Sequence, residues 1–310
     1  MKKIIATLML IALALTSFVA CGEPKENEYT LAIGVAVTKN IESSKFTQTV
    51  ASVVIDAEGK VVACNFDCVD YTAYKDGAIV TTAPASKVTL GENYKMPAGS
   101  WAKQTESLAE HIVGMTKDEV AAIPLGDDGK TTDTELKATC SFDITDAIAA
   151  VGKAFASEHK IAFKSSADSF TTALSVVASA NDTSKDATED APASTNVKLS
   201  VTYAGVVLAD GAVVAAILDT AEPEFKNFSA EGVAESISYK GTKREQGESY
   251  DAYRPMKAGT WYVQADAYVK AALGLTKDNI STLASEGVAG CTISVTDYKE
   301  AIEAAVKAAK

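Results

Sequence analysis

The chain has 310 residues, of which 47% are hydrophobic and 23% charged, and its formal net charge is −12. This length and apolar content suffice for an ample buried core and for two ordinary domains. Nucleic acid is not an expected partner, because binding to a polyanion needs clustered basic side chains. With two histidines and no cysteine pair at metal-ligand spacing beside them, a zinc site is not expected either.

The first twenty residues have the pattern of a secretory signal peptide. Lys2 and Lys3 precede an apolar run from Ile4 to Leu15, and small residues stand just before Cys21. The segment SFVAC, residues 17–21, resembles the lipobox of bacterial lipoproteins, with phenylalanine where leucine is usual. That resemblance implies cleavage before Cys21 and acylation of its thiol, which would anchor the protein in a membrane. The alternatives are a plain signal peptide and a short membrane-spanning helix, for which the apolar run falls short of the ~20 residues needed.

Two segments of the remaining chain have closely similar sequences. AGSWAKQTESLAEHIVGMTKDEV begins at Ala98, and AGTWYVQADAYVKAALGLTKDNI begins at Ala258. They align the only two tryptophans, Trp101 and Trp261. Flanking segments also align: SVVIDAEGKVVACNFD from Ser52 with AGVVLADGAVVAAILD from Ala204, and CSFDITDAI from Cys140 with CTISVTDYK from Cys291. Because the segments occur in the same order in both halves, the sequence predicts a duplicated domain.

Each copy contains the same predicted elements. It opens with a strand, at Leu31 or Ala173, and continues through a polar connection into a hairpin. The hairpin turns at Gly59 or Gly211, where glycine allows the positive φ of a tight turn. A long irregular segment leads to the repeated helix, and a last strand and a terminal helix close the copy. The last strands are predicted to begin at Cys140 and Cys291.

The repeated helix is predicted to bury one face. Mostly apolar residues recur in it at helical spacing, namely Trp101, Thr105, Leu108, Ile112 and Met115 in the first copy and Trp261, Ala265, Tyr268, Ala272 and Leu275 in the second. Ser100 and Thr260 suit the N-cap position, and Gly114 and Gly274 suit the helix stop. Thr116 with Glu119 predicts a capping box at the start of the next short helix. A packing role for both tryptophans is expected.

The expected fold class is α+β, with two similar tandem domains that each consist of an antiparallel sheet packed by helices. A signal peptide occupies residues 1–20 and a polar tether residues 21–29. The repeat domains span residues 30–160 and 161–310. Residues 181–196, NDTSKDATEDAPASTN, lack large apolar side chains and are predicted to form a mobile acidic loop inserted into the second domain.

The cysteines are predicted to pack in the core. A bond between Cys64 and Cys68 is not expected, because four residues of strand span about 13 Å and a disulfide needs Cα atoms within ~7 Å. Strand alternation places both on one face with Val62 and Phe66, as small buried side chains. A bridge from Cys140 to either of them remains an alternative.

One cluster of residues is a candidate ligand site. The only two arginines, Arg244 and Arg254, lie close in sequence to Lys243, Tyr250 and Trp261. A guanidinium suits a carboxylate or phosphate, and aromatic rings suit a flat ligand or a sugar, so a small anionic or aromatic ligand is the expected type. The alternative is a solvated loop whose cations balance the neighbouring acids Glu245, Glu248 and Asp251. The motifs of the sequence indicate no catalytic residues and no metal site.

With the repeat in view, the chain resembles tandem-repeat lipoproteins of anaerobic Gram-positive bacteria, some of which are classed with FMN-binding-domain proteins. The matching segments are DGAVVAAILDTAE from Asp210, TKREQGESY from Thr242, GLTKDNI from Gly274 and TDYKEAIEAAVKAA from Thr296. The flavin-carrying members attach FMN covalently to the last threonine of an S-G-A-T-like motif. This chain has no such motif, so the resemblance implies at most non-covalent FMN.

These patterns predict a lipoprotein on the extracytoplasmic face of the cell membrane that acts as a non-enzymatic binding or scaffold module without a cofactor. The membrane, reached through the lipid anchor, is the expected partner, and the sequence indicates no particular protein partner. The alternative, carried by the resemblance alone, is a flavin-binding or extracellular electron-transfer protein. A solute-binding component is a third hypothesis, but the two-lobe α/β pattern usual in that class is missing.

Overall fold

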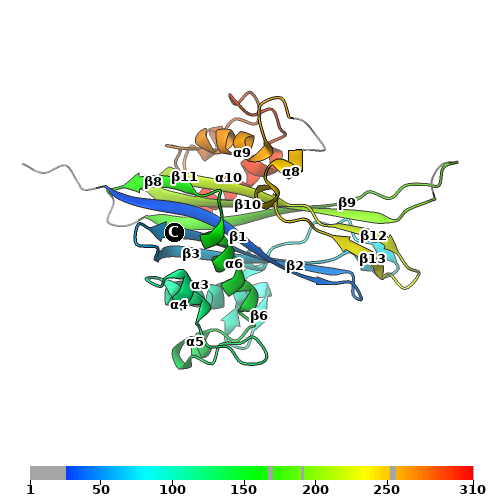
Figure 1. The fold of residues 1–310 in the computed structure, drawn as a ribbon, viewed down its shortest axis with the longest axis horizontal. Coiled ribbons are helices and arrows are strands. Elements are labelled where there is room, and N and C mark those ends of the chain that lie inside the picture. Colours follow the sequence, from blue (N-terminus) through cyan, green and yellow to red (C-terminus); the bar gives the residue numbers. More distant parts are fainter. Residues whose placement is uncertain (1–25, 167–169, 190–191, 252–255, 310) are drawn as a thin grey trace, which may run out of the picture.

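The computed structural model describes residues 26–166, 170–189, 192–251 and 256–309. Two antiparallel sheets lie face to face, and helices cover the outer surface of each sheet (Figure 1). The order of layers is therefore helix, sheet, sheet, helix. The first half of the chain forms the lower two layers of Figure 1, and the second half forms the upper two. The expected α+β class with antiparallel sheets packed by helices is confirmed.

The first sheet has the strand order β3-β2-β1-β8. Its strands are β1 (Asn27–Asn40), β2 (Lys45–Asp56), β3 (Val61–Thr72) and β8 (Ile161–Ser165). Gly59 has a φ of 78° in the turn between β2 and β3, as predicted. β8 is antiparallel to β1, so this sheet continues past residue 160, where the boundary between the halves was expected.

The second sheet is built around the long strand β10. Its strands are β9 (Thr171–Asp182), β10 (Asn196–Ala209), β11 (Ala212–Ala221), β12 (Glu224–Phe228) and β13 (Ala234–Ser238). One side of β10 pairs with β9, and the other side pairs with β11 and then β12. Two-stranded ribbons also occur: β4 (Tyr74–Lys75) with β5 (Ala78–Ile79), and β6 (Lys95–Met96) with β7 (Gly99–Ser100).

The acidic segment 181–196 prolongs the hairpin between β9 and β10 rather than forming a separate loop. Its ends belong to these strands, and beyond them Lys185 and Ser194 form a β-bridge with backbone hydrogen bonds in both directions. The hairpin extends past the sandwich at the right of Figure 1. The prediction of an irregular loop missed this pairing, because the segment has polar side chains that pair through backbone groups alone.

Helices cover both sheets on the outside. The first half contributes α2 (Lys87–Leu90), α3 (Trp101–Ile112), α4 (Lys117–Ala121), α5 (Thr134–Thr139) and α6 (Thr145–Ala156), with the 3₁₀ turn η1 (Gly91–Asn93). The second half contributes α7 (Lys243–Gln246), α8 (Glu248–Asp251), α9 (Trp261–Lys270) and α10 (Thr296–Ala308), with η2 (Ile280–Thr282). Among the described residues, none of these helices is long and apolar enough to cross a bilayer.

The predicted last strands are wrong. The segments that begin at Cys140 and Cys291 are irregular and lead directly into α6 and α10. Their backbone is held by a side chain instead of a neighbouring strand. Gln104 Oε1 accepts hydrogen bonds from the backbone N–H and the hydroxyl of Ser141, at 2.6 and 3.0 Å. Gln264 accepts the same two bonds from Thr292, at 2.8 and 2.9 Å.

The repeated helix is α3 in one half and α9 in the other, and the predicted faces are buried in both. Trp101 is 3% exposed and Trp261 is 1% exposed. Gly114 N–H donates to Val61 O at 2.7 Å, and Gly274 N–H donates to Val213 O at 2.8 Å, so each helix stop docks on the start of β3 or β11. The capping box of Thr116 and Glu119 is present at α4.

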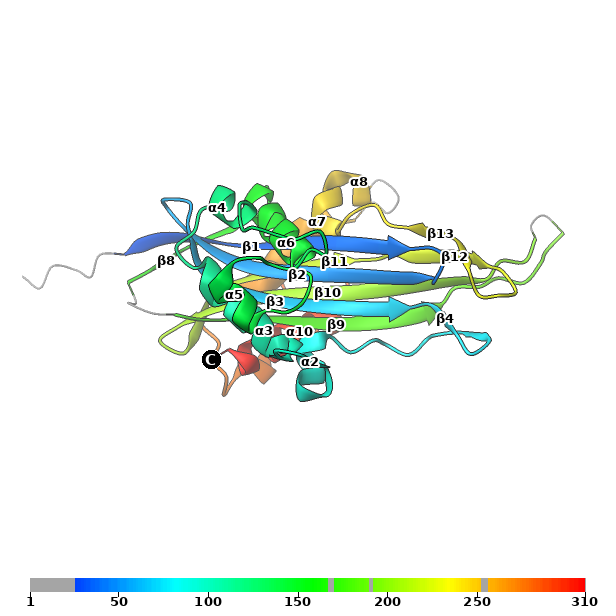
Figure 2. The same ribbon diagram turned by 90° about the horizontal axis from the view of Figure 1, so that it is seen from below.

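The inner faces of the two sheets share one hydrophobic core. It contains residues from both halves, among them Leu31, Val50, Tyr71, Tyr203, Ile217 and Phe225. Two further cores lie between each sheet and its own helices. At one long edge of the sandwich β3 lies beside β9, and at the other β1 lies beside β11. The strands of both sheets run along the long axis of the molecule (Figure 2). The halves are therefore related by a half-turn about an axis parallel to the strands.

The sheet registers correct one detail of the sequence alignment. Ser52 pairs with Asn65, and Gly205 pairs with Ile217. Since Asn65 and Ile217 align with each other, Ser52 corresponds to Gly205 and not to Ala204. The first hairpin turn is one residue longer, which shifts the alignment by one position. Ser52 and Gly205 meet between the sheets, where a Cβ on Gly205 would lie 2.4 Å from Ser52 Oγ.

The four cysteines among the described residues are free. Cys64, Cys68 and Cys140 are buried in the core between the first sheet and its helices, which confirms the packing prediction. Burial raises the pKa of the Cys68 and Cys140 thiols to about 11. Val62 does not share their face: the pairing shifts between Val54 and Ile55, and Val62 packs against the core between the sheets. Cys21 lies outside the described residues.

Candidate functional site

Lys243 is buried in the second half beside two aromatic rings. Its ammonium lies 5.0 Å from the ring centre of Tyr250 and 5.3 Å from that of Trp261. A carboxylate oxygen of Glu222 lies 3.2 Å from the ammonium. The Trp261 indole N–H donates to the Tyr298 hydroxyl at 2.8 Å. The rings and the carboxylate offset the desolvation of the ammonium, so Lys243, Tyr250 and Trp261 serve internal contacts of the fold.

The first half repeats this arrangement. Lys87 lies 5.1 Å from the ring centre of Tyr94 and 5.7 Å from that of Trp101, and its ammonium is 3.3 Å from Asp70 Oδ2. Because the same contacts occur in both halves, they connect the repeated helix to the strand end and the short helix before it. This is a packing role, as the sequence predicted for the tryptophans.

Each half also buries one aspartate in an edge strand, Asp67 in β3 and Asp219 in β11. Asp67 Oδ1 accepts hydrogen bonds from the N–H groups of Cys68 and Val88, at 2.7 and 3.1 Å. Asp219 Oδ1 accepts them from Thr220 and Arg244, at 2.8 and 3.1 Å. Burial raises the pKa of both carboxyl groups to about 6, against the opposing effect of their hydrogen bonds and neighbouring cations.

Protonation of these aspartates should stabilise the fold. Because the folded pKa of Asp67 is above the unfolded value of 3.8, its contribution is present at pH 4 and is lost as the pH rises through 6. A rise of two pKa units corresponds to about 3 kcal/mol. We expect the free energy of unfolding of Asp67→Asn, relative to that of the wild type, to rise by about this amount from pH 4 to pH 7. Urea unfolding at each pH measures it. The exposed Asp278→Asn is the control, and parallel profiles for Asp67→Asn and the wild type would contradict the assignment.

Arg244 is the main difference between the halves at this place. The first half has Val88, whose N–H bonds to Asp67 as that of Arg244 bonds to Asp219. Arg244 is only 4% exposed, so the predicted solvated loop is wrong for this residue. Its Nε donates to Leu218 O and its Nη2 to Asp266 Oδ1, while Nη1 has no hydrogen-bond partner among the described residues.

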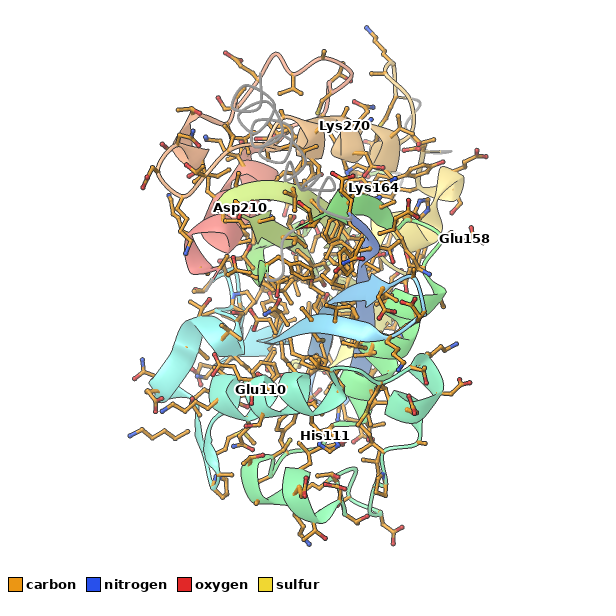
Figure 3. The ribbon with its side chains drawn as sticks, turned by 90° about the vertical axis from the view of Figure 1, so that its left-hand side faces the viewer. Glu110, His111, Glu158, Lys164, Asp210 and Lys270 are labelled. Atoms are coloured by element: carbon orange, nitrogen blue, oxygen red, sulfur yellow. The ribbon has the colours of Figure 1, made fainter. Side chains whose placement is uncertain are left out.

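A cleft of about 500 Å³ opens beside Arg244, at the junction of the two halves. The first half lines it with β1, with the last turn of α6 and with the residues that follow α6: Ile33, Gly34, Val35, Lys153, Ala156, Ser157, Glu158 and His159. The second half lines it with the end of β11 and with α7: Asp219, Thr242, Arg244, Glu245, Gln246 and Gly247. In Figure 3, Glu158 lies at the flank of the molecule, between the helices of the first half and α7 and α8 of the second. Clefts of this size hold small molecules.

The charged groups of the cleft come from both halves. Lys153 Nζ lies 2.9 Å from Glu245 Oε1 and so connects α6 to α7. The ring of His159 packs on Tyr262 of α9, with ring centres 4.4 Å apart. Burial and the charge of Arg244 lower the pKa of His159, so its imidazole is neutral at pH 7. Glu158 is exposed and forms no ion pair with any described residue.

A second cleft of about 420 Å³ lies on the opposite edge of the sandwich, where the half-turn places the counterpart of the first. It is lined by Phe66, Val88, Phe170 and Leu174, among others. The two clefts thus occupy equivalent positions in the two halves, but the first contains the buried Arg244 where the second contains the exposed Val88. Only the first combines a cation from one half, Arg244, with a histidine and a carboxylate from the other, His159 and Glu158.

The five residues of the predicted ligand site have different positions. Arg244 lines the cleft, whereas Lys243, Tyr250 and Trp261 pack into the second half. Arg254 lies outside the described residues. The cations are balanced by Glu222 and Asp266, which are distant in sequence, and not by the neighbouring acids. No sequence pattern indicated Lys153, Glu158 and His159, because their role depends on how the halves pack.

No group of three potential metal ligands occurs within the described ranges. Comparison of the chain with family models, with curated proteins and with solved structures gave no match.

Proposed function

We propose that this protein is a membrane-anchored extracytoplasmic lipoprotein that acts as a non-enzymatic binding module, built from two copies of one domain. The observation that carries the binding role is the cleft at the junction, where Lys153, Glu158 and His159 of one half meet Arg244 of the other. The duplication is supported by contacts that recur in both halves, those of Lys87 and Lys243, of Gln104 and Gln264, and of Asp67 and Asp219. The leader sequence and the segment SFVAC support the location.

The anchor is tested by changing Cys21. In the native host the Cys21→Ser variant should move from the membrane fraction to the soluble or secreted fraction, because the acyl chains would no longer hold it. Intact-mass measurement of the wild type should show added lipid and no leader peptide. A variant that stays with the membrane would contradict lipid anchoring through this cysteine.

The binding role is tested with the protein extracted from its host. Native mass spectrometry should show a small molecule carried by the intact protein, and this mass should be reduced in an Arg244→Lys variant that unfolds at a similar temperature. A yellow preparation with the mass of FMN would favour the flavin hypothesis instead. Protein that carries no ligand in the host extract, and gains none when host metabolites are added, would contradict the binding role.

A further inference from the structure

We propose that the junction cleft recognises a small zwitterion, a molecule that carries a carboxylate together with an amino group, as amino acids do. This inference rests on the proposed binding role and names the ligand class of the same site. It follows from which charges of the cleft are already paired within the protein and which are not.

Most charged groups of the cleft already have partners. Lys153 pairs with Glu245, whose carboxylate also accepts the Thr242 N–H at the start of α7. Asp219 accepts backbone N–H groups from Thr220 and Arg244. These contacts stabilise the local structure, so they are not the groups that a ligand would engage first.

Two groups of opposite charge remain. Arg244 Nη1 is buried and has no partner among the described residues, and a buried guanidinium N–H without an acceptor costs free energy. Glu158 is exposed at the same cleft without an ion pair among those residues. A carboxylate would satisfy the first group and an amino group the second. Because one group comes from each half, a zwitterion would bridge the halves.

The charges also disfavour a simple anion of high charge. Glu158, Glu245 and Asp219 all line the cleft, so a phosphate dianion would approach three carboxyl groups as well as the guanidinium and Lys153, whose ammonium already pairs with Glu245. A monoanionic carboxylate with its own amino group would avoid this repulsion. His159 is half-buried in the same cleft, where burial and the charge of Arg244 lower the pKa of its imidazole, so it adds no second positive charge beside the guanidinium at pH 7.

The test measures binding by calorimetry on the chain from Gly22 onward, which keeps every described residue. The probes are the twenty amino acids, betaine, acetate, ethylamine and inorganic phosphate. We expect at least one amino acid or betaine to bind, with acetate, ethylamine and phosphate at least tenfold weaker. Glu158→Gln should weaken that binding at least tenfold, and Glu300→Gln, an exposed change on α10, should leave it unchanged.

Several results would overturn the inference. Phosphate or acetate that binds as tightly as the amino acids, with no effect of Glu158→Gln, would assign the cleft to simple anions. Failure of every probe to bind would also overturn it. If a different class of molecule is then found on the protein from the host, the binding role stands and the zwitterion assignment alone fails. Because Glu158 is exposed, its variant should unfold at the wild-type temperature, so the effect would not reflect misfolding.

Discussion

Replacing Gly34 by alanine should destabilise the fold by about 3 kcal/mol or more, as severe overpacking does. Gly34 lies in β1 where α6 crosses the sheet in direct contact. A Cβ at this position would lie 2.0 Å from Ala150 O and 2.4 Å from Ala154 N. Both are backbone atoms that cannot rotate away, so α6 would have to move off the sheet. Urea unfolding of the variant measures the loss.

The control for this substitution lies in the helix that Gly34 contacts. A Cβ on Gly152 of α6 would meet no atom within 4 Å. Gly152→Ala should therefore stabilise the protein by about 0.5–1 kcal/mol, because alanine is the better helix former. Because α6 leads into Glu158 and His159, Gly34→Ala should also weaken ligand binding at the cleft. Equal stability of Gly34→Ala and the wild type would contradict the packing of α6 on β1.

Replacing Gly205 by serine should cost about 2 kcal/mol or more, for a reason that concerns both halves. Gly205 in β10 faces Ser52 in β2 across the core between the sheets. The new Cβ would lie 2.4 Å from Ser52 Oγ and 3.2 Å from Ile217 Cγ2. Ser52 Oγ would have to rotate away, and the remaining short contacts with Ser52 Cβ at 3.3 Å and Ile217 leave little room for the added hydroxyl in the core shared by the two halves. Unfolding in urea measures this cost as well.

The partner residue allows a rescue experiment. In the Ser52→Gly background the clash with Oγ is absent, so Gly205→Ser should cost much less there than in the wild type. We expect a coupling free energy of about 1–3 kcal/mol in the double-mutant cycle. Additive costs would show that residues 52 and 205 do not face each other, and the face-to-face arrangement of the sheets would then be wrong.

Much of the architecture could be predicted because the signals are local. The turn glycines Gly59 and Gly211 and the apolar face of the repeated helix need only a few neighbouring residues to be recognised. The prediction of a last strand in each copy, at Cys140 and Cys291, was wrong because it too relied on a local signal. Alternation after Cys140 indicates which side chains are buried but not what holds the backbone, and Gln104, far away in sequence, holds it.

The candidate site could be predicted only in part. Arg244 could be found from the composition of the chain, because it is one of only two arginines in an acidic protein. Its buried position depends on Leu218 and Asp266, and the cleft beside it depends on the first half, which supplies Glu158 and His159. The packing of one half on the other carries no short sequence pattern. For the same reason, the sequence could not show that the two halves share one core.

The position of β1 has a consequence for how the protein stands on a membrane. β1 begins at Asn27, six residues after Cys21, and six residues of extended chain reach at most about 20 Å. This end of the sandwich and the acidic hairpin between β9 and β10 lie at opposite ends of the long axis (Figure 1). With Cys21 held in the outer leaflet, the β1 end of the sandwich would stay within about 20 Å of the bilayer, and the opposite end would be the one free to extend furthest from it. The negatively charged hairpin tip would then be the part of the molecule that first meets whatever approaches from outside the cell.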